Sequence, residues 1–232
     1  MPLIKSSILG MLLTFLSTAG AVPASCLKPK PNECGFYREC LEEKYHCGDS
    51  GYPLAYGEKY CHRFNSLNES NLSPEGLKWR DATLVCLQED LVGRLLSPSY
   101  VANCDQLKQV AYNSHPRCYT QPGNSICSLK YNDVFQIVST VDAKDGFTLP
   151  SGIQIGKVII TCKNEYLNKL RELLGKREQL SSLMMYQSMH TSSNAKPLNT
   201  NLEQEQLSQK IDNELEDVQL KLQLIDGIGY EL

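Results

Sequence analysis

The sequence predicts an all-α fold: a disulfide-stapled helical bundle with a C-terminal helical extension. Ten cysteines lie within residues 26–162, and none lies in the last 70 residues. In the cysteine-rich part, apolar residues recur at helical steps more often than at the alternating steps of a strand. The chain should therefore divide into a cross-linked helical part and a C-terminal part that is held by packing.

The composition is that of a folded globular chain. Of its 232 residues, 41% are hydrophobic and 21% are charged, and the formal net charge is −3. These fractions exclude a multipass membrane protein. Because no excess of basic residues exists to follow a phosphate backbone, nucleic-acid binding is not expected.

Residues 1–24 have the features of a secretory signal peptide. Lys5 precedes an apolar run over residues 8–16 that is too short to span a bilayer, and small residues follow it. We expect cleavage after Ala21 or Ala24; the short run disfavours the alternative of an uncleaved anchor. No later segment reaches the length of a transmembrane span. The predicted location is secreted and extracellular, in an oxidising compartment.

The even number of cysteines is typical of a disulfide framework in a secreted chain. Five bridges with no spare thiol is the simplest arrangement, although spacing alone leaves the pairing open. A zinc site is the alternative, but no two cysteines have C-x2-C spacing and the histidines lack H-x3–5-H spacing. We therefore predict structural disulfides, no metal ion and no cofactor. The cysteines are Cys26, Cys34, Cys40, Cys47, Cys61, Cys86, Cys104, Cys118, Cys127 and Cys162.

Three segments carry helix signals before residue 130. Residues 34–47 place apolar side chains at helical steps. The Ser-Pro-Glu sequence at residues 73–75 is a helix start, with serine as N-cap and proline in the first turn. One face of that helix then carries a leucine stripe, formed by Leu84, Leu87, Leu91 and Leu95. Residues 104–114 share a third helical face, and Pro116 is expected to end it.

Residues 131–162 leave helix and strand open, because their β-branched residues fit both. Residues 145–146 and 150–152 contain the glycines and proline that mark a loop. From Val158 onward the period is helical again, which predicts a long helix that reaches about Tyr186.

The expected organisation after the signal peptide has three parts. Residues 25–186 form the disulfide-rich helical domain, residues 187–201 a polar linker, and residues 202–232 an amphipathic helix. The last helix has an apolar seam, formed by Ile211, Leu215, Val218, Leu222 and Ile225. This seam could dock on its own domain, as an amphipathic helix does, or pair with another chain as in a coiled coil.

The sequence contains no pattern of an established catalytic class. It lacks G-x-S-x-G, H-E-x-x-H and the local sequence around the cysteine of papain-like proteases. We therefore predict no catalytic residue and a protein that is not an enzyme. A secreted enzyme with a site that is assembled only in space is the alternative.

Two kinds of processing signal are present. Asn68 and Asn71 begin N-x-S sequons in a polar stretch, so both are candidate glycosylation sites. Gly175-Lys176-Arg177 resembles a prohormone cleavage signal, and a cut there would release a C-terminal peptide. We favour a charged helix face at this position, because a helix resists proteolysis.

The cysteine pattern resembles that of the stanniocalcin family. The resemblance covers residues 26–162 and the helix after them. It rests on the order of the cysteine gaps together with CGFYRECLE, YCHRF, G-x-x-W-x-x-x-T-x-x-CLQ at residues 76–88, and HPRCY. The family consists of secreted, mainly α-helical glycoproteins with hormone-like or inhibitor-like activity. Vertebrate members are linked to calcium and phosphate balance, some block a secreted metalloprotease, and none is an enzyme.

The resemblance also implies a disulfide pairing. Carried over position by position, the implied pairs are Cys26–Cys40, Cys34–Cys61, Cys47–Cys104, Cys86–Cys118 and Cys127–Cys162. Familiar members have an eleventh cysteine that bridges two subunits, whereas this chain has none after Cys162. A covalent homodimer is therefore not expected, and a non-covalent homodimer would use residues 202–226. The usual sequon of the family is also missing from residues 41–46, which leaves Asn68 and Asn71.

We expect the chain to act by binding an extracellular protein or receptor. A few exposed aromatic or arginine side chains supply most of the binding energy in such interfaces. The candidates are Tyr52, Tyr56, Tyr60 and Trp79. A secreted enzyme and a precursor cut at Lys176-Arg177 are the other two hypotheses.

Overall fold

The computed structural model describes residues 22–96, 103–146, 149–190 and 198–231, and the structural statements below concern these residues. Helices dominate this part of the chain, and five disulfides link them, so the predicted fold class is confirmed. A two-stranded antiparallel hairpin, β1 (Thr120–Gln121) with β2 (Asn124–Ser125), is the strand structure of the described residues. Residues 1–21, which contain most of the predicted signal peptide, lie outside the described ranges.

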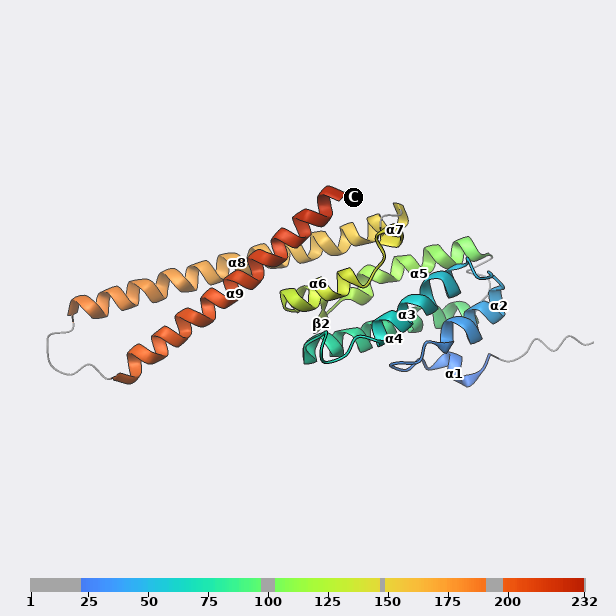
Figure 1. Cartoon of the computed structure of the whole chain (residues 1–232), viewed down its shortest axis with the longest axis horizontal. Helices are drawn as coiled ribbons and strands as arrows, with labels where there is room; N and C mark the ends of the chain where they lie inside the picture. Colours follow the sequence, from blue (N-terminus) through green and yellow to red (C-terminus); the bar gives the residue numbers. More distant parts are fainter. Residues whose placement is uncertain (1–21, 97–102, 147–148, 191–197, 232) are drawn as a thin grey trace, which may run out of the picture.

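The helical elements follow one another closely along the chain. In order they are α1 (Ala24–Leu27), the π-helical η1 (Phe36–Glu42), α2 (Glu43–Tyr45), the π-helical η2 (Pro53–Glu58), α3 (Lys59–Asn65), α4 (Pro74–Leu96), α5 (Cys104–Tyr119), the 3₁₀ turn η4 (Ile126–Ser128), α6 (Tyr131–Ser139), α7 (Ala143–Gly146), α8 (Leu149–His190) and α9 (Leu198–Glu231). Figure 1 shows α1–α5 gathered at one end and α8 and α9 packed as an antiparallel pair, whose far end projects beyond the other helices.

Two large apolar clusters form the core. The first centres on Phe36, Leu41 and Leu107, and it packs the N-terminal helices against the adjoining ends of α4 and α5. The second includes Trp79 and Leu173, and it joins the other half of α4 to α6, α8 and α9. All four leucines of the predicted stripe on α4 are buried, so that expectation is confirmed.

The five disulfides join elements that are distant in sequence. Among the described residues no cysteine is free. The bonded pairs are those that the resemblance implies: Cys26–Cys40, Cys34–Cys61, Cys47–Cys104, Cys86–Cys118 and Cys127–Cys162. The last two fasten α4 to α5 and η4 to α8. Each bridge limits the freedom of the unfolded chain, and such bridges typically contribute about 2–4 kcal/mol.

The helix start at Ser73 is confirmed and is reinforced from another helix. Ser73 Oγ accepts a hydrogen bond from the Gly76 N–H at 3.1 Å, as an N-cap does. The buried Asp133 carboxylate of α6 accepts from the Ser73 N–H at 2.7 Å and from the Ser73 hydroxyl at 2.6 Å. A Cβ at Gly76 would lie 2.8 Å from Asp133 Oδ1, so glycine makes this close approach possible.

Two predicted helix boundaries are wrong. Pro116 does not end its helix, since α5 continues to Tyr119. Two contacts hold this last turn: the Cys86–Cys118 bridge, and the hydrogen bond that the Thr120 hydroxyl donates to the Pro116 carbonyl. Residues 150–152 form no loop but lie in the first turn of α8. Proline is tolerated there, because an N–H in the first turn has no partner within the helix.

The helix-or-strand alternatives for residues 131–162 resolve in favour of helix. α6 occupies residues 131–139, and α8 ends at His190, four residues after the predicted end at about Tyr186. The described part of the predicted linker is also helical: residues 187–190 belong to α8 and residues 198–201 to α9, while residues 191–197 lie outside the described ranges. None of the described helices combines the length and the apolar character that a bilayer span needs.

The apolar seam of α9 packs on its own chain. Ile211, Leu215, Val218 and Ile225 are buried in the second core cluster, and Leu222 is partly buried against it. Of the two alternatives for the last helix, the structure therefore has the docked one. A homodimer through the seam of residues 202–226 is not available in this arrangement, because the side chains that would form it already contact α6 and α8.

Replacing Asp133 with alanine should destabilise the fold by about 3 kcal/mol or more. The change leaves two part-buried donors of Ser73 without a carboxylate acceptor, and bonds to charged groups contribute about 1.5–3 kcal/mol each. Urea unfolding monitored by circular dichroism measures the loss. Asn132→Ala is the matched control, since Asn132 is exposed beside it and should change stability by less than about 0.5 kcal/mol. Equal effects of the two variants would contradict the role of the carboxylate.

Candidate functional site

A cavity of about 420 Å³ lies between the N-terminal helices and the α8–α9 pair. Its walls come from η2, α3, α4, α5, α6, α7, α8 and α9, and most of its lining is apolar or aromatic. Pockets that take small molecules have volumes of about 300–1,000 Å³ and walls of this character. The cavity is therefore the candidate functional site of the described residues.

One face of α8 forms the longest wall. The lining residues of this helix recur at helical steps and are Gln154, Ile155, Val158, Ile159, Cys162 and Tyr166. From Gln154 to Tyr166 a helix rises about 18 Å, because each residue advances the axis by about 1.5 Å. The cavity is therefore elongated along α8.

Tyrosines form much of the opposite wall. Tyr52 and Tyr56 each meet the ring of Tyr112 edge to face, with centroids 6.0 and 5.6 Å apart. Tyr37 packs edge-on against Tyr52, and burial raises the pKa of both of these phenols. Edge-to-face pairs of this kind contribute about 0.5–1.5 kcal/mol beyond burial alone, so the aromatic wall is a packed structure.

The aromatic residues that we predicted as exposed anchors are therefore misassigned. Tyr52 and Trp79 are buried at 5% and 2% exposure, and Tyr56 and Tyr60 are half-buried at the cavity. The error has a physical cause: an aromatic ring contributes more free energy in a core than on a surface, and spacing in sequence does not reveal which occurs.

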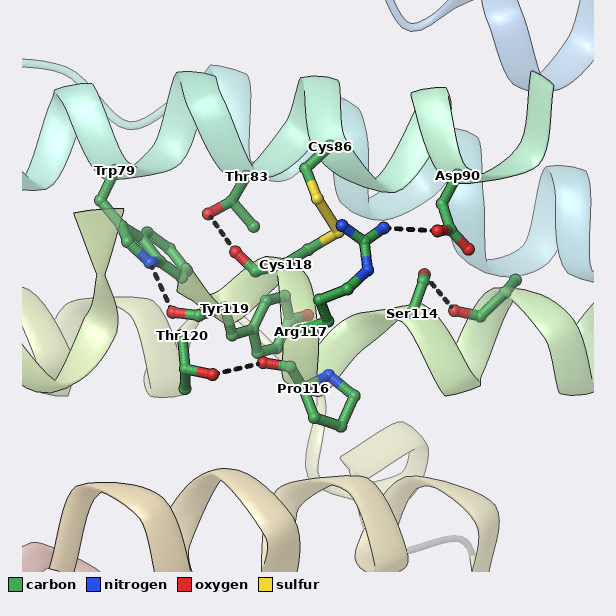
Figure 2. Close-up of a disulfide and its surroundings, with 11 residues drawn as sticks. Trp79, Thr83, Cys86, Asp90, Ser114, Pro116, Arg117, Cys118, Tyr119 and Thr120 are labelled. Carbon is green, nitrogen blue, oxygen red and sulfur yellow. Dashed lines mark hydrogen bonds and ion pairs between the residues drawn. A yellow bond between two sulfur atoms is a disulfide. The ribbon is translucent and has the colours of Figure 1, made fainter. Parts of the chain in front are cut away.

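The Cys86–Cys118 bridge positions the end of α5 that faces the cavity (Figure 2). On one side of it, Trp79 Nε1 donates to the Tyr119 carbonyl at 3.1 Å and the Thr83 hydroxyl donates to the Cys118 carbonyl at 3.4 Å. Arg117 forms an ion pair with Asp90 of α4 on the exposed side. These four connections between α4 and α5 hold the last turn of α5 in place, together with the His115 and Tyr119 side chains that line the cavity.

His115 is a strongly perturbed titratable group in the cavity wall. Its ring stacks on Tyr119, with centroids 5.4 Å apart and planes at 9°, and meets Tyr112 edge to face. Burial lowers the pKa of His115 to about 4, and the neighbouring Gln154 amide offsets this only in part. The contact with Gln154 lacks hydrogen-bond geometry, because Gln154 Oε1 is buried without a hydrogen-bond partner.

A charged cluster borders the cavity where α3 meets α7. The Lys59 ammonium lies 2.7 Å from Asp142 Oδ2 and 2.6 Å from Asp145 Oδ2, and Arg63 binds Asp142 Oδ1 at 2.6 Å. The Tyr60 hydroxyl donates to Asp145 at 2.6 Å. Hydrogen bonds from Arg63 and then from Lys59 lower the pKa of Asp142 to about 2. The cluster ties α3 to the segment between α6 and α8, and so closes one side of the cavity.

A second ion pair lies in the wall that α9 provides. Lys221 is buried, with its ammonium 2.6 Å from Asp217 Oδ2, 2.7 Å from the Leu129 carbonyl oxygen and 5.0 Å from the centre of the Tyr166 ring. Asp217 also accepts a hydrogen bond from the Tyr131 N–H at the start of α6, at 2.7 Å. The pair fixes α9 to α6.

The predicted modification sites lie away from the cavity. Asn68 and Asn71 are both exposed in the turn before α4, where each side-chain oxygen accepts a backbone N–H of the same turn. Lys176 and Arg177 lie within α8 and form ion pairs with Glu172 and Asp212. The described residues contain no group of three or more His, Cys, Asp or Glu that could hold a metal ion.

Burial and ion pairing set the state of the ionisable side chains in the cavity wall. A general base works best with a pKa near the working pH, and a pKa of about 4 makes the His115 imidazole a weak base at neutral pH. The carboxylates in the wall, Asp142 and Asp145, already accept bonds from Lys59, Tyr60 and Arg63. No sequence pattern indicates His115 or Gln154, since the two lie 39 positions apart and meet only through the packing of α5 on α8.

Comparison with protein-family models, with curated proteins and with solved structures finds no match to this chain. The resemblance to the stanniocalcin family therefore remains a prediction from the cysteine pattern and the associated motifs.

The stability of the protein should fall between pH 6.5 and about 4 because of His115. In that window the unfolded chain binds a proton at the imidazole, whose ordinary pKa is 6.5, while the folded chain does not. The contribution of the neutral His115 to the free energy of unfolding is fully present above pH 6.5. It falls by at most about 3 kcal/mol as the pH decreases to about 4. Urea unfolding at a series of pH values tests this. The His115→Gln variant should lack the slope, and an identical slope in both proteins would contradict the assignment.

Proposed function

We propose that the protein is a secreted, stanniocalcin-like glycoprotein that acts by binding an extracellular protein. The activity would be hormone-like signalling or inhibition of that partner, with a link to calcium and phosphate balance. Secretion is supported by the signal-like residues 1–24 and by the five disulfides, which persist in oxidising compartments. Glycosylation is supported by the exposure of Asn68 and Asn71.

The observation that carries the binding proposal is an apolar surface at the far end of the α8–α9 pair. Beyond Leu180 on α8 and before Ile211 on α9, none of the residues whose side chains are described is buried. Figure 1 shows that this end projects beyond the other helices. We name it the tip surface; its exposed apolar residues are Leu183, Met184, Met185, Tyr186, Met189, Leu202 and Leu207. Contiguous exposed apolar side chains mark interaction sites, and methionine adapts its shape to a partner.

The charges around the tip surface favour a partner of a different kind over a second copy. Glu203 and Glu205 alternate with Leu202 and Leu207 at the start of α9. A two-fold dimer through this surface would bring the same acidic residues of both chains together. The favoured partner therefore presents an apolar patch that is bordered by basic side chains.

Replacing the two most exposed methionines of the tip surface, Met185 and Met189, with glutamate should weaken partner capture at least tenfold, or by about 1.4 kcal/mol. The two side chains are 64% and 67% exposed, and glutamate is a good helix former, so the helix should persist. The test is quantitative capture of medium and cell-surface proteins by purified wild-type and variant protein. Ile160→Glu, at a position of α8 that is 64% exposed outside the tip surface, is the matched control.

The proposal is supported by a protein that both the wild type and Ile160→Glu capture and that the methionine variant does not capture. Capture of the same proteins by all three would overturn the role of the tip surface. Size-exclusion chromatography with light scattering gives the mass in parallel. A wild-type dimer that the methionine variant dissociates would show that the tip binds a second copy instead.

A further inference from the structure

Gln154 Oε1 is a buried polar atom of the cavity wall that has no hydrogen-bond partner among the described residues. Gln154 is 6% exposed, lines the cavity near the start of α8, and its Oε1 atom makes no hydrogen bond to the described residues. A buried acceptor left without a donor costs about 1–3 kcal/mol. A molecule in the cavity with an O–H or N–H group at this position would remove that cost.

The charges of the wall are already neutralised. The charged residues that line the cavity within the described ranges are Asp142, Asp145 and Lys221, and each forms an ion pair. The imidazole of His115 is neutral at physiological pH, because burial lowers its pKa to about 4. A ligand anion would therefore find no uncompensated cation here, and its desolvation would oppose binding.

The shape of the cavity favours an elongated ligand. The α8 wall extends from Gln154 to Tyr166, a rise of about 18 Å along the helix. Between these ends the wall consists of Ile155, Val158, Ile159 and Cys162, with a tyrosine wall facing it. A ligand can therefore form a hydrogen bond at the Gln154 end of the cavity and apolar contacts along the rest of the α8 wall.

We infer that the cavity binds an uncharged, elongated apolar molecule with one hydroxyl group, which is the chemistry of a sterol. The hydroxyl donates to Gln154 Oε1, and the ring system lies along α8 against the tyrosine wall. This inference does not depend on the protein-binding proposal, because the tip surface is built from other residues at the far end of α8 and α9.

Dehydroergosterol, a fluorescent sterol, is the probe that tests the inference. Trp79 is the single tryptophan of the chain, and its ring packs against the cavity residue Tyr119 at 5.7 Å. Bound sterol should therefore accept excitation energy from Trp79 in a saturable titration with one site per chain. Cholesterol should displace it, and palmitate, which carries a carboxylate, should not.

Val158→Phe tests whether the sterol occupies the cavity. The larger ring fills space beside the α8 wall, so affinity for dehydroergosterol should fall at least tenfold. Ile160→Phe is the matched control, since Ile160 lies two positions along the same helix and is 64% exposed. The non-reducing mass and the circular dichroism of each secreted variant report whether it is folded.

Gln154→Leu tests the hydroxyl contact without narrowing the cavity. Removing the buried, unpaired acceptor should not lower the stability of the free protein. The substitution should lower the affinity for dehydroergosterol about five- to tenfold, which is the equivalent of one neutral hydrogen bond. Cholestane has the sterol rings without the hydroxyl, so its affinity, measured by displacement of dehydroergosterol, should be equal for the wild type and this variant.

The inference fails if wild-type protein shows no saturable energy transfer from Trp79. If Val158→Phe and Ile160→Phe bind dehydroergosterol with equal affinity, the sterol lies on the outer surface and not in the cavity. Displacement by palmitate as efficient as by cholesterol would overturn the assignment of an uncharged ligand. A negative result in these sterol experiments would not change the result expected for the methionine variant of the tip surface.

Discussion

The covalent cross-links are the constraint on which the rest of the structure depends. The elements before α4 are short: η1 continues into α2 and η2 into α3, and the two resulting helical runs, residues 36–45 and 53–65, are too short to be stable alone. The bridges Cys26–Cys40, Cys34–Cys61 and Cys47–Cys104 hold these elements together and against the start of α5. The apolar cluster around Phe36, Leu41 and Leu107 then fixes them, and the bridges add to this because they have already removed much of the freedom of the unfolded chain.

Two carboxylates, the buried Asp133 and the partly buried Asp217, complete this framework by linking the start of one helix to the side of another. Asp133 of α6 binds the N-cap residue of α4, and Asp217 of α9 binds the first N–H of α6 and the ammonium of Lys221. Anions at helix starts are favourable because the unpaired N–H groups of the first turn point at them. Together with Cys127–Cys162, these contacts arrange α4, α6, α8 and α9 around the cavity.

The molecule consequently offers two separate sites of different character. The cavity is partly open to solvent, rich in tyrosine and neutralised by internal ion pairs, which suits a small apolar molecule. The tip surface is open and flanked by acidic residues, and its methionines adapt their shape to a partner, which suits a macromolecule. α8 connects them, because its first half lines the cavity and its last turns carry the tip residues.

The sequence by itself determined the helical class, the cross-linked part and the N-cap at Ser73, because periodicity, cysteine count and capping chemistry are local properties. The stanniocalcin-like pattern supplied the same five pairs that the structure contains. Only the tertiary structure decided that α5 passes through Pro116, that the seam of α9 is used within the chain, and that His115 meets Gln154. Each of these depends on contacts between segments far apart in sequence, whose energies no local pattern records.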